Sequence, residues 1–251
     1  MINQSVDVDK HLGKDGFLIN PFGPNIFHFT LNDNVLLNIE NYINDFLNDE
    51  YAQKEIENVI VAHSPEYTNN GLHYNTISSG FIKPISPKYD LDKNSYLGNI
   101  IYNMCTRYFK LCLENINKDI SLRQFLTDKS VEELTFEGVD NTKISVVDIW
   151  YVEMQDGDFH AMHDHSKTAS VSGGIYLHTP DVPFPQSLIS WVRSGNTLGA
   201  FNEGSWGLQP KKGDVFIWPS WLSHHVYPFK GKDLNRKMIS FNAFMEEKND
   251  K

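Results

Sequence analysis

The second half of the chain, from Lys143 onward, is a succession of short β-rich runs, and this feature limits the possible folds most. Gly, Pro, Asn and Asp separate the runs, and regularly spaced short strands with such turn residues are typical of β-sandwiches and barrels. We therefore expect a mainly β fold. The runs are KISVVDIWYVEM, SVSGGIYL, QSLISWV, GDVFIWP, HHVYPF and RKMISFNAFM.

The first half has a different character. A strand is expected at Asn25–Leu31, and two segments, 35–51 and 96–116, carry apolar residues at helical spacing. Between these helices, residues 64–87 are rich in Pro, Gly and Asn. We predict an irregular loop with short strands there, acting as a lid or substrate rim, because long loops in compact domains are often functional.

No stretch of linker composition separates the halves, so we expect one domain over residues 1–251. Residues 1–142 would form a helical and loop part packed on the outside, and residues 143–246 the β core. The N-terminus has no apolar segment typical of a signal peptide, and no run approaches the ~20 apolar residues of a membrane span. A net charge of −10 without clustered Lys and Arg disfavours nucleic acid as a partner.

Cysteine usage points to a reducing compartment. The only two cysteines, Cys105 and Cys112, lie seven residues apart in a predicted helix, which separates them by about 10 Å along its axis. This distance is too long for an undistorted disulfide, so we expect free thiols and a cytoplasmic protein.

Three of the ten histidines lie within six residues, in the stretch GDFHAMHDHSKT. If this stretch is a strand, His163 and His165 share a face and Asp164 points away. Two imidazoles on one face suit a metal ion, although such pairs also occur on solvated strands. A metal needs a further ligand, and the downstream run WPSWLSHHV offers His224 and His225.

An arginine follows the downstream histidines. Arg236 opens the otherwise apolar run RKMISFN. Taken alone, it is compatible with an exposed strand end. If it is buried instead, its guanidinium needs an anion.

Taken in order, these segments resemble the double-stranded β-helix (jelly-roll) Fe(II)/2-oxoglutarate-dependent dioxygenases, and in particular an HxH branch common in marine bacteria and phages. The resemblance covers roughly residues 143–244 and is specific, because five separated segments match in order. They are Trp150, Gly157 with HDH (163–165), SGGIYL (172–177), WPSWLSHHV (218–226) and RKMISFN (236–242).

The resemblance implies a fold, a site and a reaction. The fold would be a jelly roll with the N-terminal helices packed outside. Its metal ligands would be His163, His165 and His224, with Fe(II) as the metal. Arg236 would bind the distal carboxylate of 2-oxoglutarate, and Tyr176 or Ser240 could add a hydrogen bond. With O₂, such an enzyme releases succinate and CO₂ and oxidises, most simply hydroxylates, a small-molecule or peptidyl substrate.

One departure keeps alternatives open. Most of the superfamily has a carboxylate where this chain has His165, and three histidines also suit Zn²⁺. A bulge in the strand could let Asp158 or His160 join or replace a ligand. Within enzymes, the alternative is a cupin-like three-histidine metalloenzyme that does not use 2-oxoglutarate. Outside enzymes, it is a non-catalytic metal- or ligand-binding jelly roll.

Small and aromatic residues near the motifs carry structural expectations. We expect Gly173 and Gly174 to relieve crowding where a strand and a ligand approach each other. Four tryptophans in or beside the β runs are expected in the core: Trp150, Trp191, Trp218 and Trp221.

Overall fold

The computed structural model describes residues 2–6, 11–14, 16–20, 25–50, 54, 81–84, 96–118, 142–192 and 204–247. Most of the predicted loop 64–87 lies outside these residues, so its role as a lid stays a prediction. Within it, the structure describes only the short strand β4, Phe81–Pro84. Within the described residues, no helix is long and apolar enough to cross a membrane.

The described part of the chain is mainly β, as expected, with two long helices, α1 (Asp33–Asn48) and α4 (Tyr96–Lys118). Twelve strands form two antiparallel sheets with the orders β1-β2-β3-β10-β7-β12-β5-β4 and β6-β11-β8-β9. The strands are β1 (Ile2–Val6), β2 (Gly16–Asn20), β3 (Ile26–Thr30), β4, β5 (Thr142–Met154), β6 (His160–His163), β7 (Val171–His178), β8 (Ile189–Val192), β9 (Ser205–Leu208), β10 (Asp214–Pro219), β11 (Ser223–Val226) and β12 (Arg236–Glu247).

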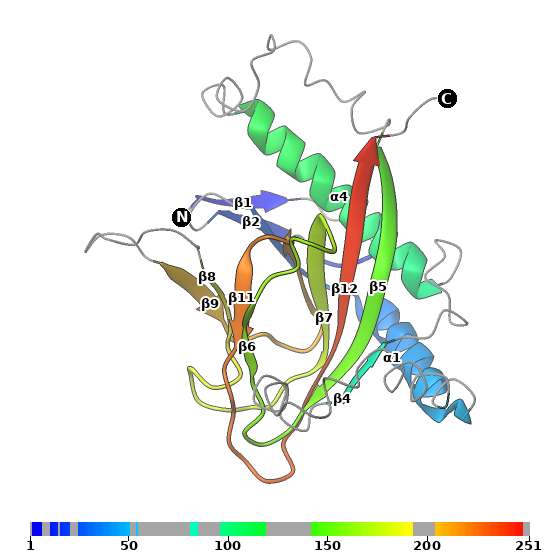
Figure 1. The fold of residues 1–251 in the computed structure, drawn as a ribbon, viewed down its shortest axis with the longest axis vertical. Coiled ribbons are helices and arrows are strands. Elements are labelled where there is room, and N and C mark those ends of the chain that lie inside the picture. The colour runs from blue at the N-terminus through cyan, green and yellow to red at the C-terminus, as the bar shows by residue number, and fades with distance from the viewer. Residues whose placement is uncertain are drawn as a thin grey trace.

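From β5 onward the chain alternates between the two sheets, except that β8 and β9 both lie in the small one. Strands β5, β7, β10 and β12 lie together in the large sheet, whereas β6, β8, β9 and β11 form the small one. Eight antiparallel strands distributed over two sheets in this order define a jelly roll. Figure 1 shows the small sheet to the left of the long strands β5 and β12, helix α1 to their right, and helix α4 crossing them.

The large sheet is buried on both faces, which explains the nearly continuous apolar run of β10. Val215 and Ile217 belong to a core shared with the helices, whereas Phe216 and Trp218 belong to a second core shared with the small sheet. Alternate residues of a strand point to opposite faces, so a strand between two layers must be apolar throughout.

Both helices bury the stripe that the sequence predicts. In α1 the buried side chains are Leu36, Ile39, Ile43 and Phe46. They pack in the same core as residues of α4 and the outer face of the large sheet. Burying each such side chain stabilises the fold by about 1.5–3 kcal/mol. The cysteines of α4 are free thiols, in agreement with their separation on one helix.

Two expectations about aromatic residues need correction. Trp191 and Trp218 are buried, as expected, but Trp221 is 51% exposed because it lies in the turn between β10 and β11, outside both sheets. Trp150 is only partly buried and lines the cavity described below. Strands β1, β2 and β9 were not expected from the sequence.

Candidate metal centre

Pairing between β6 and β11 brings the first two histidines together. In this pair of strands His163 lies opposite His224, and the centroids of the two rings are 4.3 Å apart. The register then shifts, so that His160 lies opposite Val226. Two residues of β6, Ala161 and Met162, therefore lie opposite one residue of β11, His225. This bulge turns His160 and the more exposed His163 to the same side, where both line the cavity described below.

His165 lies beside these two histidines, but it is positioned by a different contact from the one that we expected. Strand β6 ends at His163, so strand alternation does not position His165. Its backbone N–H instead donates to the carbonyl of Ser220, at 2.8 Å, in the turn after β10. Its ring centroid lies 5.1 Å from that of His163 and 5.3 Å from that of His224. As expected, Asp164 takes no part; it is exposed, and one of its carboxylate oxygens accepts from Ser166.

The three histidines offer ring nitrogens to a common point. One possible ligand atom from each lies within 4.8 Å of the others. Nδ1 of His163 faces the carbonyl oxygen of Ala161 at 2.7 Å, and Nδ1 of His224 faces that of Leu222 at 3.1 Å. A carbonyl only accepts, so each Nδ1 carries a proton, and in the neutral form of either ring the lone pair is on Nε2. This is the arrangement in which histidine binds a metal.

The surroundings keep two of these rings neutral. Burial lowers the pKa of His224 well below its ordinary value, and the charge of His163 adds to this effect. Burial, followed by the charge of His163, lowers the pKa of His165 to about 4. Neutral imidazole is the form that coordinates a metal. In donor type, protonation and convergence, these residues fit a divalent ion such as Fe(II) or Zn²⁺.

The other candidate ligands lie outside this group. Asp158 is buried and accepts a hydrogen bond from the backbone N–H of Gln155, at 2.8 Å, which stabilises the turn after β5. The ring of His225 packs against Tyr227. His160 lies beside His163, with ring centroids 5.9 Å apart, but is not part of the converging set. Among the described residues, the group that could hold a metal is thus the predicted one.

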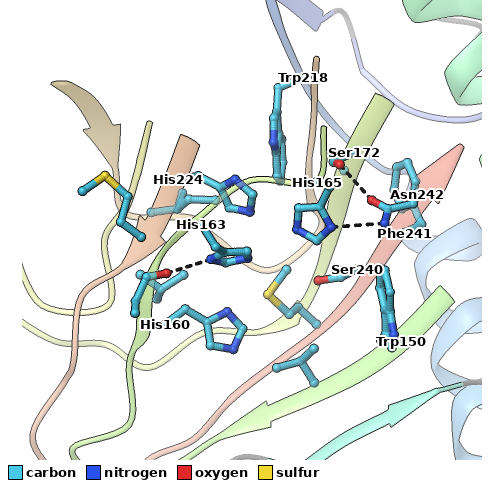
Figure 2. A pocket seen from close by; sticks show the side chains of 17 residues that line it. Trp150, His160, His163, His165, Ser172, Trp218, His224, Ser240, Phe241 and Asn242 are labelled. Carbon is cyan, nitrogen blue, oxygen red and sulfur yellow. Dashed lines mark hydrogen bonds between the residues drawn. The ribbon is translucent and has the colours of Figure 1, made fainter. Parts of the chain in front are cut away.

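A cavity of about 480 Å³ opens beside the three histidines. Its size is within the range of small-molecule sites. Figure 2 shows His163 and His224 on one side, Trp150 and Ser240 on the other, and His165 between them beside Asn242. The walls include both aromatic and polar side chains, among them Trp150, His160, Ser172, Trp218, Met238, Ser240, Phe241 and Asn242.

His160 brings a buried polar atom to this cavity. Its Nε2 has no hydrogen-bond partner among the described residues. Burial, followed by the charges of His163, Arg236 and His165, lowers the pKa of His160 to about 3. The ring is therefore neutral and has one N–H to donate. A buried polar atom without a partner is costly unless a ligand or water supplies one.

Arg236 is fully buried, not exposed at a strand end. Its Nη1 donates to the carbonyl of Ser187 at 2.9 Å, and its Nη2 donates to the hydroxyl of Tyr176 at 2.9 Å. Its guanidinium also lies over the ring of Tyr176, 4.8 Å from the centroid. Within the described part of the chain, Arg236 makes no ion pair with a carboxylate. Buried charges are normally paired, so we expect a bound anion beside this guanidinium.

The predicted co-substrate residues hold different positions around the cavity. Ser240 lines it directly, whereas Arg236 and Tyr176 are not among its lining residues. Met238 stands between, with its sulfur 3.9 Å from Nη2 of Arg236. Alternate residues of β12 share a face, so Arg236, Met238 and Ser240 all point to the space between the sheets.

The sequence interpretation missed Asn242, the next residue on this face. Its side-chain amide lies between the hydroxyl of Ser172, at 2.8 Å, and Nδ1 of His165, at 3.1 Å (Figure 2). Extending the alternation from Arg236 through Ser240 would have pointed to it.

Near the same place, Gly173 is required for packing, because a Cβ there would overlap the ring of Phe241. The crowding at this glycine therefore comes from a neighbouring strand of the protein.

Comparison with known proteins confirms the family resemblance over the segment that carries these residues. Residues 148–242 match the model of the family described as "Putative 2OG-Fe(II) oxygenase". This segment contains all three histidines and Arg236. No curated protein matches the sequence.

Solved structures similar to this chain are distant in sequence. A 2OG-Fe(II) oxygenase family oxidoreductase from Burkholderia pseudomallei is 15% identical, with 53% of this chain and 54% of that chain covered and a TM-score of 0.34. This chain thus spans about half the length of that relative. A prolyl-4-hydroxylase from Pseudomonas putida is 12% identical, with 86% and 91% covered and a TM-score of 0.47. An alpha-ketoglutarate-dependent carbocyclase from nogalamycin biosynthesis is 15% identical, with 51% and 60% covered and a TM-score of 0.33.

Proposed function

We propose that this protein is an Fe(II)- and 2-oxoglutarate-dependent dioxygenase. The observation that carries the proposal is Arg236, a fully buried guanidinium without a carboxylate partner among the described residues, in the same interior as three converging histidines. A metal site alone does not require such a cation. A dianionic co-substrate that reaches from the metal to the guanidinium does require a cation at its far end.

In this proposal the three histidines hold the metal through Nε2, with His163 and His224 oriented by backbone carbonyls. Fe(II) bound there supplies the oxidative chemistry with O₂. Three protein ligands leave open positions for the 2-oxo acid and O₂. The overall reaction converts 2-oxoglutarate, O₂ and a C–H bond to succinate, CO₂ and a C–OH group.

Arg236 would bind the distal carboxylate of 2-oxoglutarate. A planar guanidinium suits a carboxylate through two parallel hydrogen bonds, and burial strengthens the interaction. Its fork is held by Ser187 and by Tyr176, whose hydroxyl accepts from Nη2 and could turn its own proton to the ligand. Ser240, which already lines the cavity, adds a second hydroxyl. The flexible side chain of Met238 would have to move for the carboxylate to reach Arg236.

His160 would complete the binding site. Its buried Nε2 faces the same cavity, and its pKa is lowered in part by the charge of Arg236, so an anion beside Arg236 lies within its electrostatic reach. We assign its free N–H to the co-substrate. The aromatic and aliphatic walls, including Trp150, exclude water around the reacting groups.

The test is succinate release by Fe(II)-loaded protein, with the metal, 2-oxoglutarate and O₂ omitted in turn. The proposal expects slow succinate formation even without a prime substrate, dependent on all three components and lost in His163→Ala. The matched control is His225→Ala, which should retain it. Turnover that needs the metal but not 2-oxoglutarate would indicate the cupin-like alternative. Metal binding without any turnover would indicate a binding module.

A further inference from the structure

Among the described residues, the Nδ1 atoms of the three histidines have two backbone carbonyls and one side chain, the amide of Asn242, as hydrogen-bond partners. Asn242 is 1% exposed and lies on β12, directly opposite Ser172 of β7. Its Oδ1 is 2.8 Å from the hydroxyl of Ser172, and its Nδ2 is 3.1 Å from Nδ1 of His165. His163 and His224 instead direct Nδ1 to carbonyl oxygens, which only accept.

This orientation of the amide is incompatible with a metal on His165. An amide nitrogen only donates, so Nδ1 of His165 must accept and its single proton must be on Nε2. With Nδ1 occupied by Asn242 and Nε2 protonated, the neutral ring has no lone pair for the centre. Two histidines would then offer lone pairs while the third offers an N–H.

Rotating the amide by 180° removes the conflict and moves no other heavy atom. Oδ1 then accepts the proton of Nδ1 of His165, and Nδ2 donates to the oxygen of Ser172. The nitrogen and oxygen of an amide have the same shape, so the hydrogen-bond network alone decides between the two orientations. The amide keeps its hydrogen bond to Ser172 in both orientations, because a hydroxyl can donate or accept.

We propose that Asn242 is a positioning residue that sets the tautomer of His165. In the metal-bound protein its Oδ1 accepts the Nδ1 proton and directs the Nε2 lone pair to the three-histidine centre. In the metal-free protein the orientation with Nδ2 facing His165 also satisfies its hydrogen bonds. Because only the orientation with Oδ1 facing His165 is compatible with the metal, metal binding is coupled to rotation of the amide. This inference rests on the three-histidine centre of the proposed function. It adds a residue to which the sequence motifs assign no role.

The direct test is the tautomer of His165 in the wild-type protein, and it needs no substitution. Zn²⁺ is diamagnetic and suits three histidines. Two-bond ¹H–¹⁵N correlation spectra of the Zn²⁺-loaded protein distinguish Nδ1–H from Nε2–H imidazole, with His165 assigned by its loss in His165→Gln. We expect a proton on Nδ1 of His165 and a metal-bound Nε2. A proton on Nε2 of His165 in the metal-loaded protein would overturn the proposal.

A matched pair of variants tests the role energetically. Asn242→Asp keeps the shape and presents only acceptors, so His165 is held in the metal-binding tautomer and Co²⁺ affinity should equal or exceed that of the wild type. Asn242→Leu keeps the volume but has no acceptor, and Co²⁺ affinity should fall by about 10- to 100-fold, the usual effect of losing such an outer partner. Affinity is measured by anaerobic titration, and urea unfolding checks that both variants fold.

The outcomes separate this inference from the proposed function. A residue that only packs would make both variants less stable and leave Co²⁺ affinity unchanged, which would contradict the proposal. Equal losses in Asn242→Asp and Asn242→Leu would contradict it as well. If the wild type binds neither Co²⁺ nor Zn²⁺, the three-histidine centre itself fails, and the proposed function fails with it.

Discussion

At the scale of single residues, this jelly roll brings together an unusual combination of groups: three converging imidazoles, two of them kept neutral mainly by burial, a fourth with an unpartnered nitrogen, and a guanidinium without an anion in the described part of the chain. Each is costly to bury when left unpaired. Together they describe a binding site, because a metal and a dianion would satisfy all of them at once.

The histidine cluster makes the first prediction. Replacing His163, His165 or His224 with Ala removes one of three ligands, so metal affinity should fall by more than about tenfold, that is, by more than about 1.4 kcal/mol. Metal content after dialysis against limiting Fe(II) or Co²⁺ measures this. His225→Ala is the control, since its ring packs against Tyr227 on the outside of the converging set. Loss of metal in His225→Ala alone would mean that the distal ligand is misassigned.

His160 makes a prediction that the metal ligands do not share. His160→Phe keeps an aromatic ring but removes the N–H that we assign to 2-oxoglutarate. A hydrogen bond to a charged group contributes about 1.5–3 kcal/mol, so 2-oxoglutarate binding should weaken by roughly 10- to 150-fold. Metal content should stay at the wild-type level, because His160 lies outside the ligand group. If the variant loses metal but binds 2-oxoglutarate normally once reloaded, His160 is a ligand instead.

At the scale of elements, helix α4 buries Cys105 in the core and packs the partly buried Cys112 against it, and this gives a pH-dependent prediction. Burial raises the pKa of Cys105 to about 12 and that of Cys112 to about 11. At pH 8 roughly one Cys105 side chain in ten thousand is then a thiolate, the reactive form. Native protein should therefore resist iodoacetamide at pH 8, whereas both thiols should react after unfolding.

The same shifts affect stability with a definite sign. Both folded-state pKa values lie above the value of about 8.5 for an unfolded thiol, so the folded protein holds these protons more tightly. Their contribution to the free energy of unfolding is complete below pH 8.5 and decreases as the pH rises towards 11. Urea unfolding at pH 8 and pH 10 measures the change. Rapid alkylation of the native protein at pH 8 would contradict this description of α4.

Elements also show how far the sequence predicts this structure. Local patterns placed both helices and most strands of the β core, because apolar periodicity and turn residues are local properties. The bulge in β6 and the pairing of His163 with His224 depend on contacts between strands far apart in sequence, which no local pattern encodes. Arg236 was ambiguous for the same reason, since its burial depends on the Ser187 and Tyr176 that surround it.

Errors at particular residues have physical causes. Trp221 is as apolar as Trp218, but it lies in the turn two positions after Pro219, the end of β10, and is exposed there. His165 was placed by strand alternation that does not extend to it, and its position comes from Ser220 and Asn242. Asn242 was missed because a single amide has no motif of its own.

At the scale of the whole molecule, the large sheet joins the other layers, because it has one core on each face. One core contains the helices, and the other contains residues of the small sheet. We therefore propose that residues 1–251 fold as one unit. Ile39→Ala removes a fully buried side chain of α1 and should destabilise the protein by about 2–5 kcal/mol. Far-UV circular dichroism and tryptophan fluorescence, which reports Trp191 and Trp218 in the other core, should show the same shifted transition. Loss of helix signal before the fluorescence changes would indicate two separate units.

The central claim is that the buried guanidinium binds the co-substrate, and anaerobic titration of the Fe(II) protein with 2-oxoglutarate tests it most directly. Removing one partner of a buried charged pair costs about 2–5 kcal/mol, so Arg236→Met should weaken binding by roughly 30- to several-thousand-fold. Arg236→Lys should restore part of the affinity, because Lys keeps the charge but not the planar fork. Metal content and the unfolding transition serve as controls for folding. With metal content normal, wild-type affinity for 2-oxoglutarate in Arg236→Met would contradict the account and leave only a three-histidine metal site.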